Sequence, residues 1–265
     1  MTMLQPRPTS QITALRTENL SLSYGQKVAF QGISLQIPSQ QITAIVGPSG
    51  SGKSSFLSCL NRLCDLQSQC RVSGKIYLSG QNILDPKINV INLRRRVGML
   101  FQQPNPFPFS IYKNLAFPLR EHGIKDRQQI EQIITESLEL VGLWAEVKDR
   151  LKMSALRLSG GQQQRLCLAR TLALKPEVIL MDEPCSALDP ISAAVIEALI
   201  VELAQTQTIL IVTHNLAQAK RIAQQTALFW VQENAGRLIE VAPTELFFEQ
   251  PINSLTQAYV NGLQG

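Results

Sequence analysis

A glycine-rich loop that ends in a lysine and a serine is the first part of the chain able to do chemistry. Residues 47–54 match the pattern G-x-x-x-x-G-K-[ST], between an apolar strand expected over 42–46 and an amphipathic helix expected over 54–66. Its glycines let backbone N–H groups converge on a polyphosphate, and Lys53 adds a cation near the β- and γ-phosphates. An ordinary glycine-rich turn is the alternative, but every position of the pattern matches. The loop predicts a nucleotide site made by Gly47, Pro48, Ser49, Gly50, Ser51, Gly52, Lys53 and Ser54.

Two carboxylates end a second apolar strand. The strand expected over 178–181 leads directly into Asp182 and Glu183, which places charge at the carboxyl edge of a parallel sheet, beside a phosphate site. We expect Asp182 to hold Mg²⁺ through water, Ser54 to be a direct Mg²⁺ ligand, and Glu183 to polarise an attacking water. A strand-end Asp-Glu pair alone is usually just solvated, but the phosphate loop in the same chain favours the catalytic interpretation.

A third group of residues forms a second anion-binding helix start. In the run 158–165, Ser159 is able to cap a helix, and Gly160 and Gly161 leave the first N–H groups open to a phosphate. We therefore expect a helix beginning here.

Strands and helices alternate around these motifs. Asp189 caps a helix expected over 190–204, Pro190 occupies its first position, and an apolar strand is expected over 208–212. This alternation predicts an α/β fold with a mainly parallel sheet covered by helices.

Other segments complete the expected organisation. We expect strands over 12–19, 27–37 and 42–46, with a break at residues 24–25. A helix over 126–141 belongs to a helical insertion, and a hairpin over 227–241 precedes a final helix or two. The interpretation is a single domain over 12–265, with residues 1–11 as a disordered tail.

Composition excludes several classes of protein. Of 265 residues, 45% are hydrophobic and 17% are charged, which argues against intrinsic disorder, and the net charge of +5 suits phosphate ligands or an anionic membrane surface. No apolar stretch is long enough for a bilayer and residues 1–17 lack a secretory signal, so we expect a cytosolic chain. The five cysteines form no C-x-x-C pair, which favours reduced thiols over disulfides or zinc.

The motifs together resemble those of the ATP-binding cassette (ABC) family of transport ATPases. The resemblance covers nearly the whole chain and rests on the order of residues 47–54, 158–165, 178–183, 186–189 and His214. It implies an α/β P-loop nucleotide-binding cassette with a mainly parallel sheet core, an antiparallel β subdomain and a helical subdomain near 105–160. It also implies hydrolysis of ATP with Mg²⁺ by two cassettes paired head to tail, so that one nucleotide site needs two chains.

The resemblance assigns further roles by position. Tyr24 matches the aromatic residue that stacks on adenine, Gln102 the glutamine that senses Mg²⁺ and the membrane partner, and His214 the switch that contacts the γ-phosphate. A strand-end tyrosine is often only packing, and a lone histidine after a strand is usually structural.

The catalytic set that the resemblance implies is Lys53, Gln102, Glu183 and His214, and the Mg²⁺ ligands are Ser54, Gln102 and Asp182. Further ATP contacts are Tyr24, Ser55 and, from the opposing chain, Ser159, Gly160, Gly161, Gln162 and Asp189.

A narrower resemblance concerns residues 82–114, which look like the corresponding part of the ATP-binding subunit of bacterial phosphate importers. Residues 185–190 and 213–215 support it, and departures at Ser55 and 117–119 remove no catalytic group. It implies a homodimer that couples ATP hydrolysis to phosphate uptake, with two permease subunits and, through the complex, a periplasmic phosphate-binding protein. The expected location is peripheral, on the cytoplasmic face of the inner membrane, with no nucleic-acid partner.

Alternatives remain open at this point. The Pro- and Phe-rich run 104–109 is either a rigid surface loop or part of a groove for a cytoplasmic helix of a permease. Arg94, Arg95 and Arg96 are expected to form a solvated face before a strand. The imported solute is alternatively phosphonate or an amino acid, because the solute never touches this subunit. A soluble cassette of DNA repair or translation is disfavoured, since only 106 residues separate Lys53 from Ser159 and leave no room for a long insertion.

Overall fold

One mixed sheet organises the chain. The computed structural model describes residues 12–263, so the tail expected over 1–11 lies outside the described residues, as do 264–265. The strands run in the order β6-β5-β1-β2-β11-β10-β4-β9-β8-β7, with β3 beside β1. Their bounds are β1 Thr13–Tyr24, β2 Lys27–Ile33, β3 Gln36–Pro38, β4 Ile42–Val46, β5 Cys70–Leu78, β6 Gln81–Asn82, β7 Val97–Leu100, β8 Val178–Asp182, β9 Thr208–Val212, β10 Gln225–Gln232 and β11 Ala235–Pro243.

The phosphate loop and the carboxylates belong to the parallel part of this sheet. β10, β4, β9, β8 and β7 pair in parallel, in that order. All five residues of β4 and of β9 are buried, as expected for strands covered on both faces. Because parallel strands end at the same edge, the residues that follow β4, β7, β8 and β9 meet there.

The remaining strands form an antiparallel part. β1 pairs with β2, β3 and β5, and β6 pairs with β5. The expected hairpin is β10–β11, turned by Glu233 and Asn234, which both have positive φ. A single parallel register pair, Gly236 with Phe30, joins β11 to β2 and continues the sheet into the antiparallel part.

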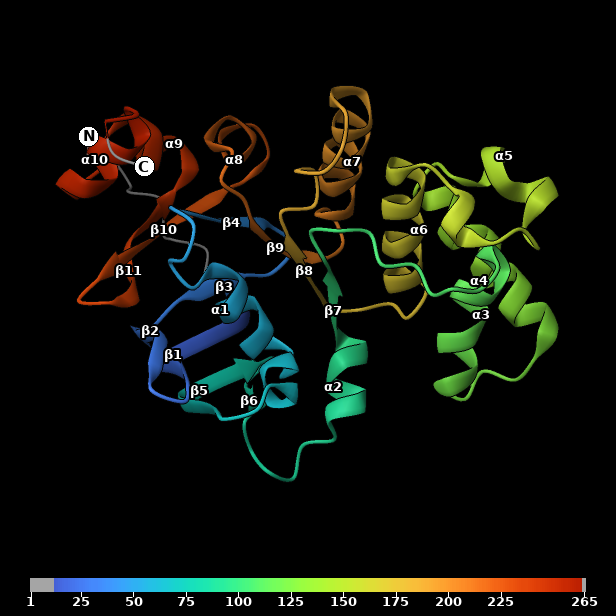
Figure 1. The fold of residues 1–265 in the computed structure, drawn as a ribbon, viewed down its shortest axis with the longest axis horizontal. Coiled ribbons are helices and arrows are strands. Elements are labelled where there is room, and N and C mark those ends of the chain that lie inside the picture. The colour runs from blue at the N-terminus through green and yellow to red at the C-terminus, as the bar shows by residue number, and fades with distance from the viewer. Residues whose placement is uncertain (1–11, 264–265) are drawn as a thin grey trace, which may run out of the picture.

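Helices cover the sheet and form a group at one end of the molecule. In Figure 1, α6 lies between α7 and the group α3, α4 and α5. No helix within residues 12–263 combines the length and the apolar character needed to cross a bilayer. The bounds are α1 Lys53–Leu60, α2 Val90–Arg96, α3 Ile111–Glu121, α4 Arg127–Leu140, α5 Trp144–Val147, α6 Gly160–Leu172, α7 Pro190–Leu203, α8 Leu216–Ile222, α9 Thr244–Glu249 and α10 Ser254–Val260.

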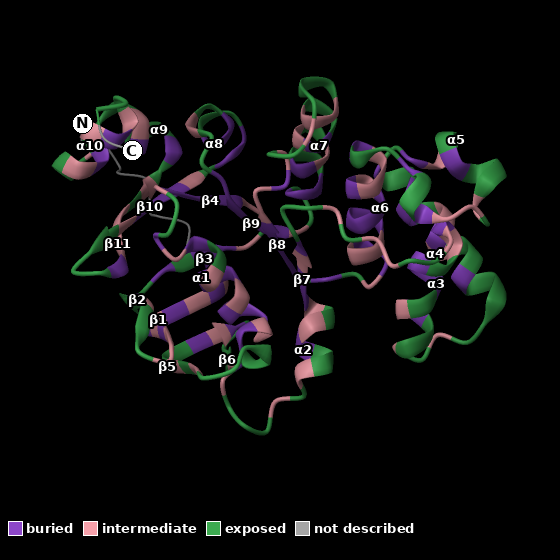
Figure 2. Cartoon of the chain, viewed as in Figure 1, coloured by how far each residue is buried: buried purple, intermediate pink, exposed green. Residues whose placement is uncertain are grey.

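Two apolar clusters hold these layers together. One packs α3, α4 and α6 against one face of the parallel strands, and the other packs α1 between the parallel and antiparallel parts. Figure 2 shows the buried residues following the central strands and the inner helix faces. At the centre of the second cluster the ring of Phe56 lies edge-on to Phe30 and Phe229, with centroids 5.7 and 5.2 Å away. The helix that carries Lys53 is therefore anchored on both sides.

Several expected boundaries are wrong. The helix expected over 54–66 stops at Leu60, because the side chain of Asn61 accepts the N–H of Leu63 and Arg62 is left-handed, with φ 58°. The strand expected over 27–37 divides into β2 and β3 around residues 34–35, where Thr17 Oγ1 accepts the N–H of Leu35 at 3.0 Å.

Two smaller expectations concern the arginines and the cysteines. Arg94 donates to the carbonyl of Arg62 at 2.7 Å, and Arg96 pairs with Glu177 at 2.6 Å, so these two cations are bonded to neighbouring segments instead of forming a solvated face. The five cysteines are free thiols, as expected.

Candidate functional site

The loop over 47–52 connects β4 to α1 and has three glycines with positive φ, and at two of them a Cβ would also meet neighbouring backbone. Gly47 has φ 139°, and a Cβ there would overlap the carbonyl oxygen of Phe229 on β10. Gly52 has φ 86°, and its Cβ would come 2.8 Å from the carbonyl oxygen of Ala29. Gly50 faces open space. The loop is thus packed tightly against β2 and β10 at its ends and open in the middle, where a phosphate is able to approach.

Lys53 begins α1, and its side chain folds back over the loop. Its ammonium donates to the carbonyls of Gly47 and Pro48 at 2.8 and 2.7 Å. The residue is only 6% exposed, and burial lowers the pKa of Lys53, although the charges of Glu183 and Asp182 oppose this shift. A cation fixed inside a ring of backbone groups is suited to polyphosphate.

Asp182 ends β8 and faces the start of α1. Its Oδ1 accepts the hydroxyl of Ser54 at 3.0 Å. Burial raises the pKa of Asp182, and the hydrogen bond from Ser54 opposes this rise. The next residue, Glu183, adopts φ 46° and donates its N–H to the carbonyl of Val212 on β9.

Glu183 is held between two residues from neighbouring strand ends. Gln102 follows β7, and its Nε2–H group donates a hydrogen bond to Glu183 Oε2 at 3.2 Å. His214, which follows β9, places Nδ1 3.0 Å from the same oxygen. Glu183 Oε1 receives no hydrogen bond from the described part of the chain and is free to face a water. The sheet thus brings Lys53, Asp182, Glu183, Gln102 and His214 to one edge. Lys53, Asp182 and Glu183 were expected there from the phosphate loop and the strand-end carboxylates, and Gln102 and His214 from the family resemblance.

The oxygen donors at this edge fit a magnesium ion. The hydroxyl of Ser54 and the carboxylate of Asp182 are already in contact. Gln102 uses its amide nitrogen for Glu183, so its amide oxygen would be the atom left for a metal ion. Mg²⁺ prefers few protein ligands and takes the rest from water and phosphate oxygens. Residues 12–263 contain no group of three or more His, Cys, Asp and Glu side chains that could by themselves hold a metal ion.

Tyr24 lies at the end of β1, beside the first turns of α1. Burial raises the pKa of Tyr24, and the nearby side chains of Ser55 and Ser58 oppose this rise. The ring is partly buried against the second apolar cluster. The structure therefore places Tyr24 and Ser55 next to the phosphate loop, while adenine stacking stays a prediction.

The second helix start is well formed. Ser159 caps α6: its Oγ accepts the N–H of Gln162 at 3.3 Å, and Gln162 Oε1 accepts the N–H of Ser159 at 3.0 Å. A Cβ at Gly160 would meet nothing within 4 Å, whereas one at Gly161 would come 2.7 Å from the hydroxyl of Ser192 on α7. Gly160 is therefore the open position, and Gly161 is needed for packing.

These residues are not joined to the phosphate loop of the same chain. No hydrogen bond among residues 12–263 links Ser159–Gln162 to the loop over 47–54. Asp189 caps α7 by accepting the N–H groups of Ile191 and Ser192 at 3.0 Å, also apart from the loop.

Gln164 is a buried residue of this region that the sequence analysis missed. Its Nε2 donates to the carbonyls of Phe101 and Pro184, at 3.2 and 3.1 Å. These carbonyls directly adjoin Gln102 and Glu183, so Gln164 ties α6 to both strand ends. Its place on the buried stripe of α6, with Gly161, Leu168 and Leu172, was the available signal, because a polar residue on such a stripe needs a partner.

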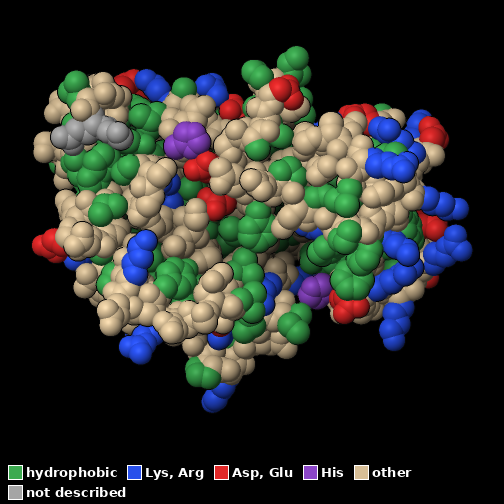
Figure 3. All heavy atoms as spheres, viewed as in Figure 1, with side chains coloured by type: hydrophobic (Ala, Val, Ile, Leu, Met, Phe, Trp, Pro, Cys, Tyr) green, Lys and Arg blue, Asp and Glu red, His purple; other side chains and the backbone are tan. Residues whose placement is uncertain are grey.

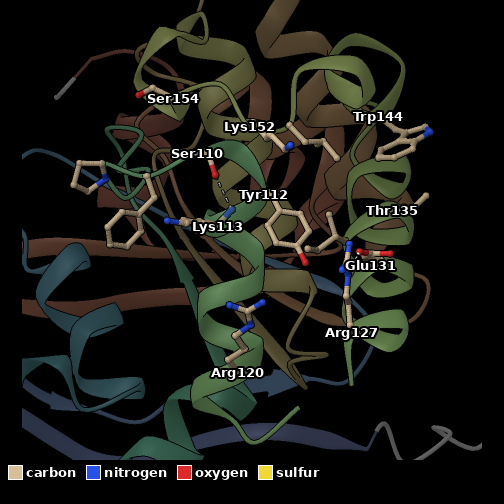
Figure 4. Close-up of a pocket in the computed structure, with 14 residues that line it drawn as sticks. Ser110, Tyr112, Lys113, Arg120, Arg127, Glu131, Thr135, Trp144, Lys152 and Ser154 are labelled. Carbon is tan, nitrogen blue, oxygen red and sulfur yellow. Dashed lines mark hydrogen bonds and ion pairs between the residues drawn. The ribbon is translucent and has the colours of Figure 1, made fainter. Parts of the chain in front are cut away.

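A large groove opens on the helical side of the molecule, with a volume of about 1070 Å³. In Figure 4, Tyr112 and Trp144 contribute aromatic walls, and Lys113 and Arg120 project from α3. Figure 3 shows Lys and Arg side chains gathered over the helices at the right of the view. The groove is thus apolar inside with a mainly cationic rim.

The loop over 104–109 forms one border of the groove and is rigid. The side chain of Asn114 accepts the N–H of Phe107 and donates to its carbonyl, at 2.7 and 3.2 Å. The guanidinium of Arg170 lies 4.3 Å from the centroid of the Phe107 ring. Phe109 lines the groove and remains 42% exposed. The two alternatives for this loop are therefore compatible, since it is both rigid and part of a groove.

Comparisons with known proteins show what the whole chain is similar to. A family model described as ABC transporter matches residues 30–186. The phosphate import ATP-binding protein PstB 1 of Nitrosococcus oceani is 54% identical over 251 residues, 95% of this chain and 91% of that relative. PstB 2 of Bacillus licheniformis is 52% identical over 262 residues, 99% of this chain and 94% of the relative. The solved structure of cbiO1 from Clostridium perfringens, described as part of the ABC transporter complex cbiONQ, matches with TM-score 0.74 and 27% identity, covering 91% of this chain and 92% of its own.

Lys53→Ala should abolish nucleotide hydrolysis and weaken nucleotide binding at least about 100-fold, because a buried phosphate loses its nearest side-chain cation. Binding is measured by titration with a fluorescent ATP analogue, and hydrolysis by phosphate release. Lys75→Ala, an exposed lysine on β5, is the control and should behave as wild type. Near-normal turnover of Lys53→Ala would show that the loop is not the phosphate site.

Proposed function

The chain belongs to the ABC transporter family, and from this premise we propose that it is the ATP-hydrolysing subunit of an importer of inorganic phosphate. The family and the α/β cassette fold were both predicted from the motifs, and both are confirmed. The choice of phosphate over phosphonate or an amino acid is supported by the names of the relatives at 52–54% identity.

The observation that carries the ATPase reaction is the convergence of Lys53, Asp182 and Glu183 at one sheet edge. Glu183 accepts the proton of a water that attacks the γ-phosphate, and the contacts from Gln102 and His214 fix its carboxylate. Lys53 holds the phosphates and stabilises the charge on the leaving group. Ser54, Asp182 and Gln102 would hold Mg²⁺, which when bound neutralises phosphate charge.

The reaction is proposed to need two chains. The open helix start at Ser159–Gln162 has no bond to its own phosphate loop, and Gly160 leaves its N–H groups accessible. In a head-to-tail homodimer this surface, together with Asp189, closes over ATP held by the loop of the opposing chain. Anion binding at a capped helix start supports this arrangement physically.

The proposed membrane partners are two permease subunits, with a periplasmic phosphate-binding protein reached through them. The groove supports a docked cytoplasmic helix of a permease, because its aromatic interior and cationic rim suit an amphipathic segment. Phe109 borders the groove, and the loop that carries it continues directly from Gln102 at the nucleotide site. The protein would then lie peripherally on the cytoplasmic face of the inner membrane.

Glu183→Gln should retain ATP binding but slow hydrolysis at least about 100-fold, because an amide does not accept the proton of the attacking water. ATP should then hold two chains together, which gel filtration with ATP detects as a dimer. Glu177→Gln is the matched control, because Glu177 lies next to the opposite end of the same strand and pairs with Arg96. A Glu183→Gln variant that is no more dimeric than wild type would contradict the shared site.

In the reconstituted complex, phosphate-loaded binding protein on the outside should raise the ATPase rate, because closure of the two chains is then favoured. Phe109→Ser should reduce this stimulation at least about fivefold, since an aromatic side chain buried by a partner contributes about 1 kcal/mol or more. The basal ATPase rate of the isolated subunit should not change.

Leu246→Ser, an exposed apolar residue on α9, is the control and should leave the stimulation intact. The same ATPase assay is repeated with phosphonate, an amino acid or nucleic acid in place of phosphate. Stimulation by one of these instead of phosphate would overturn the proposed solute while leaving the ATPase assignment in place.

A further inference from the structure

The short helix α5 lies between the groove and the start of α6. Trp144, its first residue, lines the groove. Val147, its last residue, is fully buried in the apolar cluster that also contains residues of α4 and α6. Glu146 lies between them, and its side chain is 39% exposed. It forms an ion pair with Arg165 on α6.

Each oxygen of the Glu146 carboxylate accepts a hydrogen bond from the first turns of α6. Gln162 Nε2 donates to Oε2 at 2.6 Å, and Arg165 donates to Oε1 at 2.7 Å. A second nitrogen of Arg165 donates to the carbonyl of Gly142, which precedes α5, at 2.7 Å. Burial alone would raise the pKa of Glu146, but the hydrogen bonds from Gln162 and Arg165 outweigh it and lower this pKa, so the carboxylate is charged.

The bond to Glu146 determines which way the amide of Gln162 points. With Nε2 donating to the carboxylate, Oε1 is directed at the N–H of Ser159, from which it accepts at 3.0 Å. Ser159 Oγ in turn accepts the N–H of Gln162, which leaves the hydroxyl proton of Ser159 free to donate to another group. Both ends of the Gln162 side chain are therefore used within the chain, and Ser159 and Gly160 remain available for an anion.

We propose that Glu146 is a positioning residue for the ATPase reaction, which acts through Gln162 to hold Ser159 and Gly160 in the geometry that meets the phosphate of the opposing chain. The proposal rests on the shared site of the proposed function. It also makes α5 the physical connection between the wall of the groove and the helix start, since Trp144 and Glu146 belong to the same turn.

The direct test is Glu146→Ala in the purified full chain. The kcat of ATP hydrolysis should fall about tenfold, as expected for the loss of one charge-assisted hydrogen bond. The affinity of the single chain for ATP should not change, because the phosphate loop is untouched. In the Glu183→Gln background, the same substitution should weaken ATP-dependent dimerisation by about the same factor.

A double-mutant comparison tests whether Glu146 acts through Gln162. Gln162→Ala alone should lower kcat, and adding Glu146→Ala should lower it no further. Glu136→Ala is the matched control, because Glu136 accepts an equally short bond from Gln132 on α4, at 2.7 Å, and should leave kcat unchanged. Thermal unfolding of all variants shows whether the helical region is still folded.

The outcomes separate the inference from the proposed function. Two results would overturn the positioning role and leave the proposed function intact. The first is a kcat of Glu146→Ala within twofold of wild type. The second is that adding Glu146→Ala to Gln162→Ala lowers kcat by the same factor as Glu146→Ala does in the wild-type chain. The positioning role would also be overturned if lower ATP affinity and lower thermal stability of Glu146→Ala accounted for its whole loss of ATPase activity. If Glu183→Gln does not dimerise with ATP, the shared site fails, and the role of Glu146 fails with it.

Discussion

The burial of one ammonium group, that of Lys53, is the constraint on which the rest of the site depends. A buried cation is costly unless fixed dipoles and charges surround it, and here the carbonyls of Gly47 and Pro48 and the nearby carboxylates of Asp182 and Glu183 do so. This surrounding exists only because three parallel strands end at the same edge. The phosphate loop, the Ser54–Asp182 contact and the orientation of Glu183 all follow from that register.

In the proposed shared site, each chain contributes two surfaces. One surface holds the phosphate loop and the strand ends, and the other presents the capped start of α6. Gln164 connects the two within a chain, since it bonds beside both Gln102 and Glu183, and Glu146 connects the second surface to the groove.

The sequence predicted the parts of this arrangement that depend on local rules. The strands β4, β8 and β9 are short apolar runs, Asp189 and Pro190 mark the start of α7, and the phosphate loop has a fixed pattern, so their positions followed directly. β5 was missed because four of its nine residues are exposed and Gly74 interrupts its alternation. The division of β2 from β3, the partners of Gln164 and the bonds of Glu146 depend on contacts between different segments of the chain, which periodicity and spacing do not encode.

The central claim, that one nucleotide site is built from two chains, is tested most directly by mixing two inactive variants. Lys53→Ala removes the phosphate loop's cation, and Gly160→Glu places a carboxylate in the open space at the helix start, where it repels phosphate. In a mixed dimer the intact loop of one chain meets the intact helix start of the other. If dimers assort randomly, the equimolar mixture should recover up to about a quarter of the wild-type ATPase rate. A mixture as inactive as either variant alone would contradict the account.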